Sequence, residues 1–221
     1  MSRSWKIALA GLLLPIAAAP AAFVAFRPVT VIPRLSIAPG HSLVDQDGAR
    51  LTSDDLRGSM TLYGFTYGSC GAVCAGVLET MAAVERGLPG AGLEDIPVRL
   101  VTVSFDPLRD TPARLAELAA AAGADPSVWS FATTSDTTAA RALVGTGFGV
   151  WYERLPDGAF RHDPVLVLVD GLGIRRVEYR TGTPDPERVL AQMRELAAEA
   201  RSGGAMHLAY EAAHFLSCYA R

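Results

Sequence analysis

The chain has 221 residues, of which half are hydrophobic and 19% are charged, and its formal net charge is -3. A chain of this length and apolar content can build a core without disulfide support, which excludes a disordered protein and a small disulfide-stapled scaffold. The slight acidity and the lack of a basic cluster argue against nucleic acid as the main partner. We therefore expect one folded domain of ordinary size and an additional segment.

The N-terminus carries an uncharged apolar run from Ile7 to Phe26, and Arg3 and Lys6 precede it. The run is about long enough to cross a bilayer, and the positive residues before it favour a cytoplasmic N-terminus with the rest of the chain exported. A cleavable signal peptide is the alternative, because small residues at 17–21 offer cleavage sites. The run continues past those sites, so we favour a membrane anchor over residues 1–27.

After the anchor, residues 28–40 contain three prolines, which is typical of a linker. We assign residues 41–202 to the folded domain and residues 203–221 to a C-terminal tail. The folded domain begins with a hairpin, in which Leu43-Val44 and Arg50-Leu51 flank a turn at Asp47-Gly48.

Strand and helix patterns alternate through the folded domain. The strand candidates are Thr61–Phe65, Val98–Ser104, Val165–Val169 and Ile174–Tyr179. The helix candidates run from about Val73 to Leu88, from Pro112 to about Ala122, over about Thr137–Val144, and from Pro186 to about Arg201. This order predicts an α/β sandwich with a mixed sheet.

Cys70 and Cys74 lie where the first long strand candidate gives way to a helix, in the segment YGFTYGSCGAVC. Backbone N–H groups and the helix dipole at such a place favour the thiolate, which binds soft metals and attacks disulfides. If both residues lie on the helix, their Cβ atoms are about 5–6 Å apart on one face. The spacing alone leaves a metal chelate, a redox pair and a structural disulfide open.

His162 stands just ahead of the strand candidate that begins at Val165. A histidine at the end of a central strand can face the loop that carries the cysteines. A lone histidine before a strand is, however, more often structural or exposed to solvent. By itself, His162 is only a candidate for the same site.

Several motifs follow one another between about Gly40 and Leu196. In chain order they are LVDQDG, a strand that leads into CxxxC, VSFDPLRDTPARL, AAAGADPSVWSF and HDPVLVLVDGLG. Their order and spacing resemble the SCO/SenC family of thioredoxin-fold, membrane-anchored proteins associated with copper delivery to cytochrome c oxidase. The resemblance implies a thioredoxin-like three-layer α/β sandwich with a mixed central sheet, an N-terminal hairpin and an N-terminal membrane anchor.

The resemblance also implies that Cys70, Cys74 and His162 are copper ligands. Thiolates suit Cu(I), and an added imidazole allows the same site to accept Cu(II). The implied partners are the copper-bearing subunit of cytochrome c oxidase and a periplasmic copper donor. The implied location is a bacterial inner membrane, crossed once, with the folded domain on the periplasmic side. Pro164 stands where thioredoxin-like folds place a cis-proline beside their cysteines, which would suit a redox site equally well.

The sequence departs from the family pattern at four positions near these ligands. The family usually reads CPxVCP, whereas Gly71 and Ala75 replace the two prolines here. The family commonly has an aspartate before the histidine and a small residue after it, whereas Arg161 and Asp163 flank His162. We expect a less rigid cysteine loop and an altered local charge, with all three ligand types retained.

Asp106, Arg109 and Asp110 match the family motif DPxRDTP. They either hold the metal ligands in place or form a surface near the site on which a partner docks. Alternatively, they only shape the loop, with a turn at Asp106-Pro107 and a helix cap at Asp110 or Thr111. The simpler explanation of loop architecture is favoured. Three aromatic residues could form an interaction surface, although packing in the core or at its rim is the safer expectation: Trp129, Trp151 and Tyr152.

The tail has a pattern of its own. If it is helical, His207, Glu211, His214 and Cys218 fall on one face. This face could bind a second metal ion, but an ordinary amphipathic helix with a stray cysteine is the favoured interpretation. Cys218 is also the odd cysteine once Cys70 and Cys74 pair, so it could form an intermolecular disulfide.

Two functions fit these observations. The first, which we favour, is a metallochaperone that carries copper on Cys70, Cys74 and His162 and passes it to an oxidase by ligand exchange. The second is an enzyme, a thiol–disulfide oxidoreductase in which Cys70 attacks, Cys74 resolves and His162 is dispensable or tunes a thiol pKa. The sequence does not decide whether the chain is an enzyme.

Overall fold

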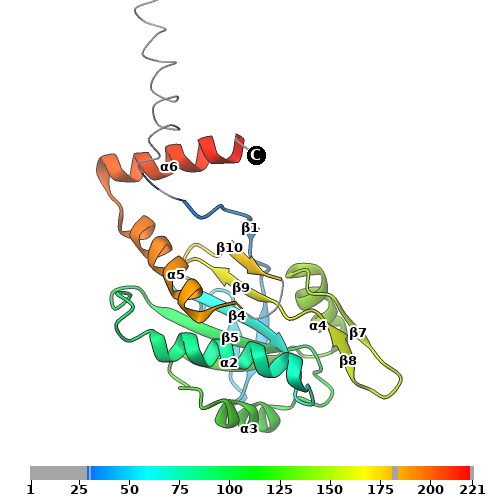
Figure 1. Cartoon of the computed structure of the whole chain (residues 1–221). Helices are drawn as coiled ribbons and strands as arrows, with labels where there is room; N and C mark the ends of the chain where they lie inside the picture. The colour runs from blue at the N-terminus through cyan, green and yellow to red at the C-terminus, as the bar shows by residue number, and fades with distance from the viewer. Residues whose placement is uncertain (1–28, 30, 181–183, 220–221) are drawn as a thin grey trace, which may run out of the picture. The chain divides into compact units, whose positions relative to one another are not determined.

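The computed structural model describes residues 29, 31–180 and 184–219, so the expected anchor at 1–27 lies outside the described residues (Figure 1). Residues Arg34–Ala197 form one compact unit, and the described residues on either side of that range belong to a second. Within the described part of the chain, no helix is both long and apolar enough to span a membrane.

The larger unit is built on an eight-stranded mixed sheet. Its strands are β1 (Ser36–Ile37), β2 (Ser42–Asp45), β3 (Arg50–Thr52), β4 (Met60–Thr66), β5 (Val98–Ser104), β6 (Trp129–Thr133), β9 (Leu166–Val169) and β10 (Ile174–Tyr179). They lie in the order β1-β10-β9-β4-β5-β6-β2-β3. The three central strands β4, β5 and β6 run parallel, and β9, β10 and β2 pair antiparallel to their neighbours.

Helices cover the sheet and complete the chain. They are α2 (Ala72–Gly87), α3 (Pro112–Ala122), α4 (Thr137–Ala140), the π-helical segment η1 (Arg141–Gly147), α5 (Pro186–Arg201) and α6 (Gly204–Tyr219). The start of α3 follows directly from the sequence, because Thr111 accepts a hydrogen bond from the backbone N–H of Arg114 and Pro112 occupies the first turn. In Figure 1, α2 and α5 lie against the same side of the central strands.

The central strand β4 is buried along its whole length, and its side chains alternate between two layers. On one side Tyr63 and Phe65 contact the ring of Phe148, which follows η1. On the other side the backbone at Gly64 lies so close to Met81 of α2 that an added Cβ would overlap its sulfur. The two layers hold β4 in the middle of the sandwich, and its C-terminal end carries the chain into the cysteine segment.

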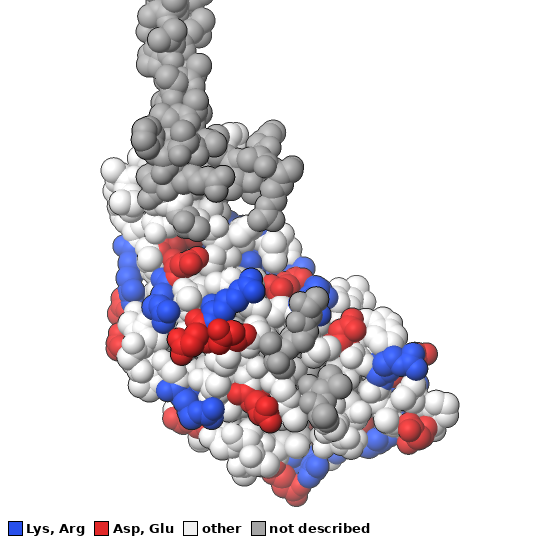
Figure 2. Space-filling view, viewed as in Figure 1, with Lys and Arg blue, Asp and Glu red and all other residues white. Residues whose placement is uncertain are grey.

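Most of the predicted elements are confirmed. The N-terminal hairpin pairs Leu43 with Leu51 and Val44 with Arg50, and the mixed sheet contains the four predicted strands. The helices expected near 73–88, 112–122 and 186–201 are α2, α3 and α5. Figure 2 shows basic and acidic side chains interleaved over the visible face of the molecule.

Three expectations need correction. The helix expected over 137–144 is the single turn α4 followed by η1, which ends at Gly147. The strand β6 was not predicted, because its short run of mixed residues lacks a clear period. No cis peptide bond occurs among the described residues, so the cis-proline considered at Pro164 is wrong.

Candidate metal centre

Cys70 and Cys74 lie at the C-terminal end of the central strand β4. The segment Tyr67–Cys74, called the cysteine loop below, follows β4 directly and enters the first turn of α2. Gly71 is the N-cap of α2, so Cys74 lies on the helix whereas Cys70 precedes it. The two cysteines form a disulfide with a Cα–Cα distance of 5.7 Å. Cys74 is buried, with 2% of its surface exposed, whereas Cys70 is only partly buried.

His162 reaches the cysteines from a hairpin outside the main sheet. Strands β7 (Tyr152–Arg154) and β8 (Phe160–His162) form a separate two-stranded sheet, called the histidine hairpin below, which the sequence did not predict. The Nε2 atom of His162 lies 3.4 Å from the Sγ atom of Cys74. The two sulfurs and one ring nitrogen of His162 all lie within 4.8 Å of one another. The structure therefore brings together the three residues implied by the sequence resemblance.

Aromatic rings surround the imidazole of His162. The ring of Tyr67 packs edge-on at a centroid distance of 5.8 Å, and that of Phe105 lies at 5.3 Å. This burial lowers the pKa of His162, an effect opposed by a hydrogen bond with the backbone of Phe160 and by the charge of Asp163. A lowered pKa keeps the imidazole neutral near pH 7, which is the form that can bind a metal.

Tyr67 also connects the cysteine loop to the histidine hairpin. Its hydroxyl accepts a hydrogen bond from the backbone N–H of Phe160 at 3.2 Å and donates to the carbonyl of the same residue at 3.4 Å. The ring centroids of Tyr67 and Phe160 are 5.0 Å apart, and the ring planes are inclined at 66°. One side chain of the loop thus holds the strand that carries His162.

The motif DPLRDTP contacts both parts of the site. Asp110 accepts a hydrogen bond from the backbone N–H of Gly68, two residues before Cys70, at 2.8 Å. Arg109 donates to the carbonyl of Gly158 in the histidine hairpin at 2.7 Å. Asp106 is buried beside Arg109, with Nε 3.5 Å from its Oδ2, and desolvation raises its pKa. The motif is therefore more than a turn followed by a helix cap.

Sequence reasoning missed the aromatic residues around His162, namely Tyr67, Phe105 and Phe160. Tyr67 and Phe105 follow predicted strands, but Phe160 lies in the unpredicted strand β8, and nothing in their spacing marks the three as neighbours. Of the aromatic residues that were considered, Trp129 and Tyr152 are buried, as the safer expectation held. Trp151 is 47% exposed.

The tail forms the helix α6, and its described side chains do not make up a second group of metal ligands. The Nε2 atom of His214 lies 2.9 Å from the Oε1 atom of Glu199, whereas His207 is exposed. The side chain of Cys218 lies outside the described residues. Among the residues whose positions are described, Cys70, Cys74 and His162 form the only group of three with metal-binding side chains.

Comparison with known proteins places the chain in a family. The SCO1/SenC family model matches residues 31–198. The chain belongs to the SCO1/SenC family. The fold of this SCO1/SenC protein is also that of solved relatives. One is a SCO1/SenC family lipoprotein from Bacillus anthracis, with a TM-score of 0.68 and 22% sequence identity. The match covers 73% of this chain and 95% of the lipoprotein chain. The thioredoxin-like α/β sandwich expected from the sequence is confirmed.

Two further relatives carry copper in their names. ScoI from Bradyrhizobium japonicum, solved with copper bound, is 25% identical to this chain and has a TM-score of 0.61. The match covers 73% of this chain and 99% of that one. A putative copper-binding protein from Stutzerimonas stutzeri is 31% identical over 87 residues, which are 39% of this chain and 42% of that protein. The match therefore spans about two fifths of the length of this curated relative.

Proposed function

We propose that this SCO1/SenC protein binds copper through Cys70, Cys74 and His162 and delivers it to the copper-bearing subunit of a cytochrome c oxidase. The convergence of three donor atoms within 4.8 Å carries this proposal. Two thiolates and one imidazole form a donor set that suits Cu(I) and also accepts Cu(II). The copper-bound relative from Bradyrhizobium japonicum supports copper as the cargo.

Copper loading requires reduction of the disulfide between Cys70 and Cys74. A dithiol reductant supplies two electrons and two protons, and the disulfide becomes two thiols while the reductant forms its own disulfide. The thiols then release their protons as the metal binds, because the thiolate is the ligand. The oxidised form is thus closed to copper, and reduction opens the site.

The exposure of the ligands favours transfer of the cargo. Cys74 is buried, whereas Cys70 and His162 keep part of their surface accessible. A ligand from the recipient can therefore approach copper from the side of Cys70 and His162 and replace them one at a time. The proposed setting is a bacterial inner membrane, where residues 1–27 would anchor the chain and a periplasmic donor would supply the metal.

The disulfide favours a second function, thiol–disulfide exchange on the cysteines of the oxidase copper site. In that reaction the thiolate of the more exposed Cys70 attacks a substrate disulfide and forms a mixed disulfide, and one substrate thiolate leaves. The thiolate of Cys74 then attacks the sulfur of Cys70 and releases the second substrate thiolate. His162 would be dispensable for this reaction, or would only adjust a thiol pKa.

Copper titration of the full chain in detergent, reduced and kept anaerobic, tests the proposal. We expect one equivalent of copper, bound tightly against a competing chelator, and a thiolate-to-Cu(II) charge-transfer band. Cys70→Ser and Cys74→Ser should each abolish the band and weaken Cu(I) binding by at least about a hundredfold, since each removes a soft ligand. No tight copper binding, together with ready cycling of the Cys70–Cys74 pair, would instead identify an oxidoreductase.

A further inference from the structure

The part of the cysteine loop around Cys70 has few restraints of its own. Gly68 and Gly71 flank the Ser69-Cys70 dipeptide, and glycine loses more conformational freedom on ordering than any other residue. Gly71 caps α2 without any side-chain hydrogen bond, and a Cβ added there would meet nothing within 4 Å. Within the loop, the backbone N–H of Cys70 donates to the carbonyl of Tyr67 at 3.1 Å. Whatever fixes Cys70 must therefore act largely from outside.

Two side chains near the start of α3 hold Gly68 from both sides. Asp110, with 2% of its surface exposed, accepts from the N–H of Gly68 at 2.8 Å, and Arg114 donates from Nη2 to the carbonyl of Gly68 at 3.0 Å. Ser104 donates its hydroxyl hydrogen bond to the same Oδ2 atom of Asp110. A Cβ at Gly68 would overlap Oδ1 of Asp110, so the contact is close enough to require glycine there.

We infer that Asp110 and Arg114 are positioning residues, a clamp that fixes the backbone at Gly68 and thereby holds Cys70 next to Cys74 and His162. Gly68 is two residues before Cys70, so freeing its N–H and carbonyl lets the sulfur of Cys70 sample many more positions. Hydrogen bonds to a buried carboxylate and from a guanidinium are charge-assisted and strong. The clamp raises the effective concentration of one sulfur beside the other, which stabilises the disulfide and prearranges the metal ligands.

The disulfide equilibrium tests this role without copper. The full chain in detergent is equilibrated with dithiothreitol, which reduces the Cys70–Cys74 disulfide with two electrons and two protons and closes its own ring disulfide. We expect Asp110→Ala to shift the equilibrium constant about tenfold toward the protein dithiol, since a hydrogen bond to a charged group is lost. Arg114→Gln, at a partly exposed side chain, should shift it about threefold, and Asp110→Asn should recover most of the loss.

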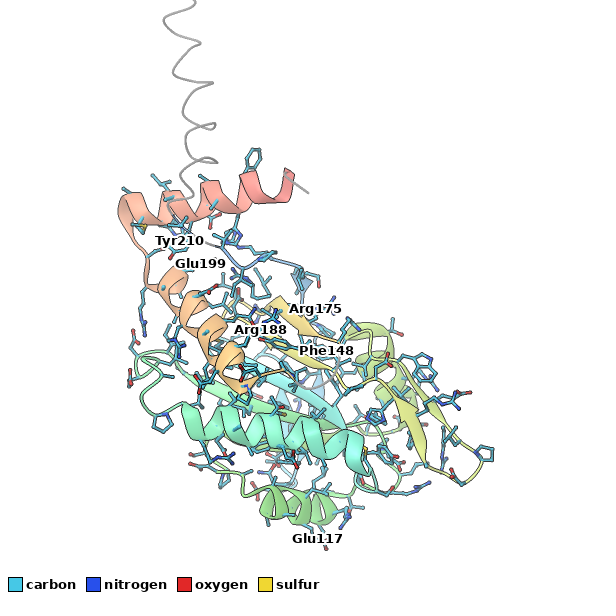
Figure 3. The ribbon with its side chains drawn as sticks, viewed as in Figure 1. Glu117, Phe148, Arg175, Arg188, Glu199 and Tyr210 are labelled. Carbon is cyan, nitrogen blue, oxygen red and sulfur yellow. A yellow bond between two sulfur atoms is a disulfide. The ribbon has the colours of Figure 1, made fainter. Side chains whose placement is uncertain are left out.

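Two control variants separate the clamp from general stability. Glu117 lies on α3 at the outer edge of the molecule in Figure 3. Glu117→Gln removes the ion-pair partner of Arg114 and leaves the contact between Arg114 and Gly68 in place. Ser104→Ala removes the other hydrogen bond to Asp110, so it should lower the unfolding midpoint. Both controls should keep the disulfide equilibrium within about twofold of the parent, because the Gly68 contacts remain.

The outcomes decide the inference even if one variant does not fold. Unchanged equilibria in Asp110→Ala and Arg114→Gln would overturn the clamp, and so would equal shifts in the two controls. If Asp110→Ala does not fold, the pair Arg114→Gln and Glu117→Gln decides alone. The part of this inference that concerns metal ligands rests on the proposed function. A parent chain that binds no copper would contradict that function, whereas the disulfide equilibrium would still test the clamp.

Discussion

The two halves of the metal centre are held in place in different ways. The cysteine loop continues from the central strand β4 into α2, and its backbone is hydrogen-bonded to Asp110 and Arg114. The histidine hairpin lies outside the main sheet, and its two strands form a separate two-stranded sheet. Ring contacts with Tyr67 and Phe105 and the hydroxyl of Tyr67 hold it against the loop. Both ends of the cysteine loop are thus continuous with elements of the core, whereas the hairpin that carries His162 is attached to the main sheet through side-chain contacts.

This difference suggests a division of labour between the two halves. A soft Cu(I) ion needs mainly the two sulfurs, whereas Cu(II) gains much more from a nitrogen ligand. The half that supplies the nitrogen would therefore control which oxidation state of copper is retained. The following experiments test whether the halves are separable in this way.

The largest effect is expected from removal of the imidazole. His162→Ala should weaken Cu(II) binding by at least about a hundredfold and Cu(I) binding by less than about tenfold, because only Cu(II) depends strongly on the nitrogen. Competition titrations with chelators for each ion measure both affinities. His207→Ala, at an exposed histidine on α6, is the matched control and should change neither. Equal losses for the two ions would contradict the division of labour.

A smaller effect is expected from loosening the connection between the halves. Tyr67→Phe removes the hydroxyl that bridges to the backbone N–H and carbonyl of Phe160 and keeps the aromatic ring. It should cost about 1–2 kcal/mol of unfolding free energy, since the N–H of Phe160 loses its partner. Hydrogen exchange at that amide should accelerate, and Cu(II) affinity should fall while Cu(I) affinity holds.

Tyr152→Phe controls for the loss of a hydroxyl in the same hairpin. The ring of Tyr152 stacks on Phe105 at 4.6 Å, and no hydrogen bond of its hydroxyl occurs among the described residues. This variant should leave both the amide exchange and the Cu(II) affinity near the parent values. An identical response from the two tyrosines would mean that ring packing, and not the bridge, holds His162.

The two halves also differ in how well the sequence predicts them. The cysteine loop follows a strand and starts a helix, and both elements have clear hydrophobic periods, so its place in the fold could be predicted. The histidine hairpin has short strands with partly exposed residues, and its hydrophobic pattern is too brief to mark it. The link between His162 and the cysteines came from resemblance to a family, not from periodicity.

The contacts that organise the site were the least predictable part. The motif DPLRDTP predicted a turn and a helix cap at Asp110 or Thr111, and the cap is Thr111. The bond from Gly68 to Asp110 joins residues 42 positions apart, and the Tyr67 bridge spans 93. Such contacts depend on where two strand ends meet in space, which local patterns do not encode.

The smallest effect is a pH dependence that belongs to the histidine half alone. Burial lowers the pKa of His162 below its usual 6.5, so the unfolded chain binds a proton more readily than the folded one. Stability should therefore fall as pH drops through about 6.5 toward the folded pKa, by less than about 1 kcal/mol for this partly exposed group. Urea unfolding of the copper-free, oxidised protein at pH 7.5 and 5.5 measures the change.

The comparison between variants isolates the contribution of His162. His41 is also partly buried and has a lowered pKa, so it adds a dependence of the same sign in every variant that retains it. His162→Gln should remove the contribution of His162, and His41→Gln should remove that of His41. Because the disulfide-bonded cysteines do not titrate, the cysteine loop contributes nothing in this range. A pH dependence that persists unchanged in His162→Gln would show that the imidazole is solvated in the folded protein, and the aromatic enclosure would then not explain its neutral form.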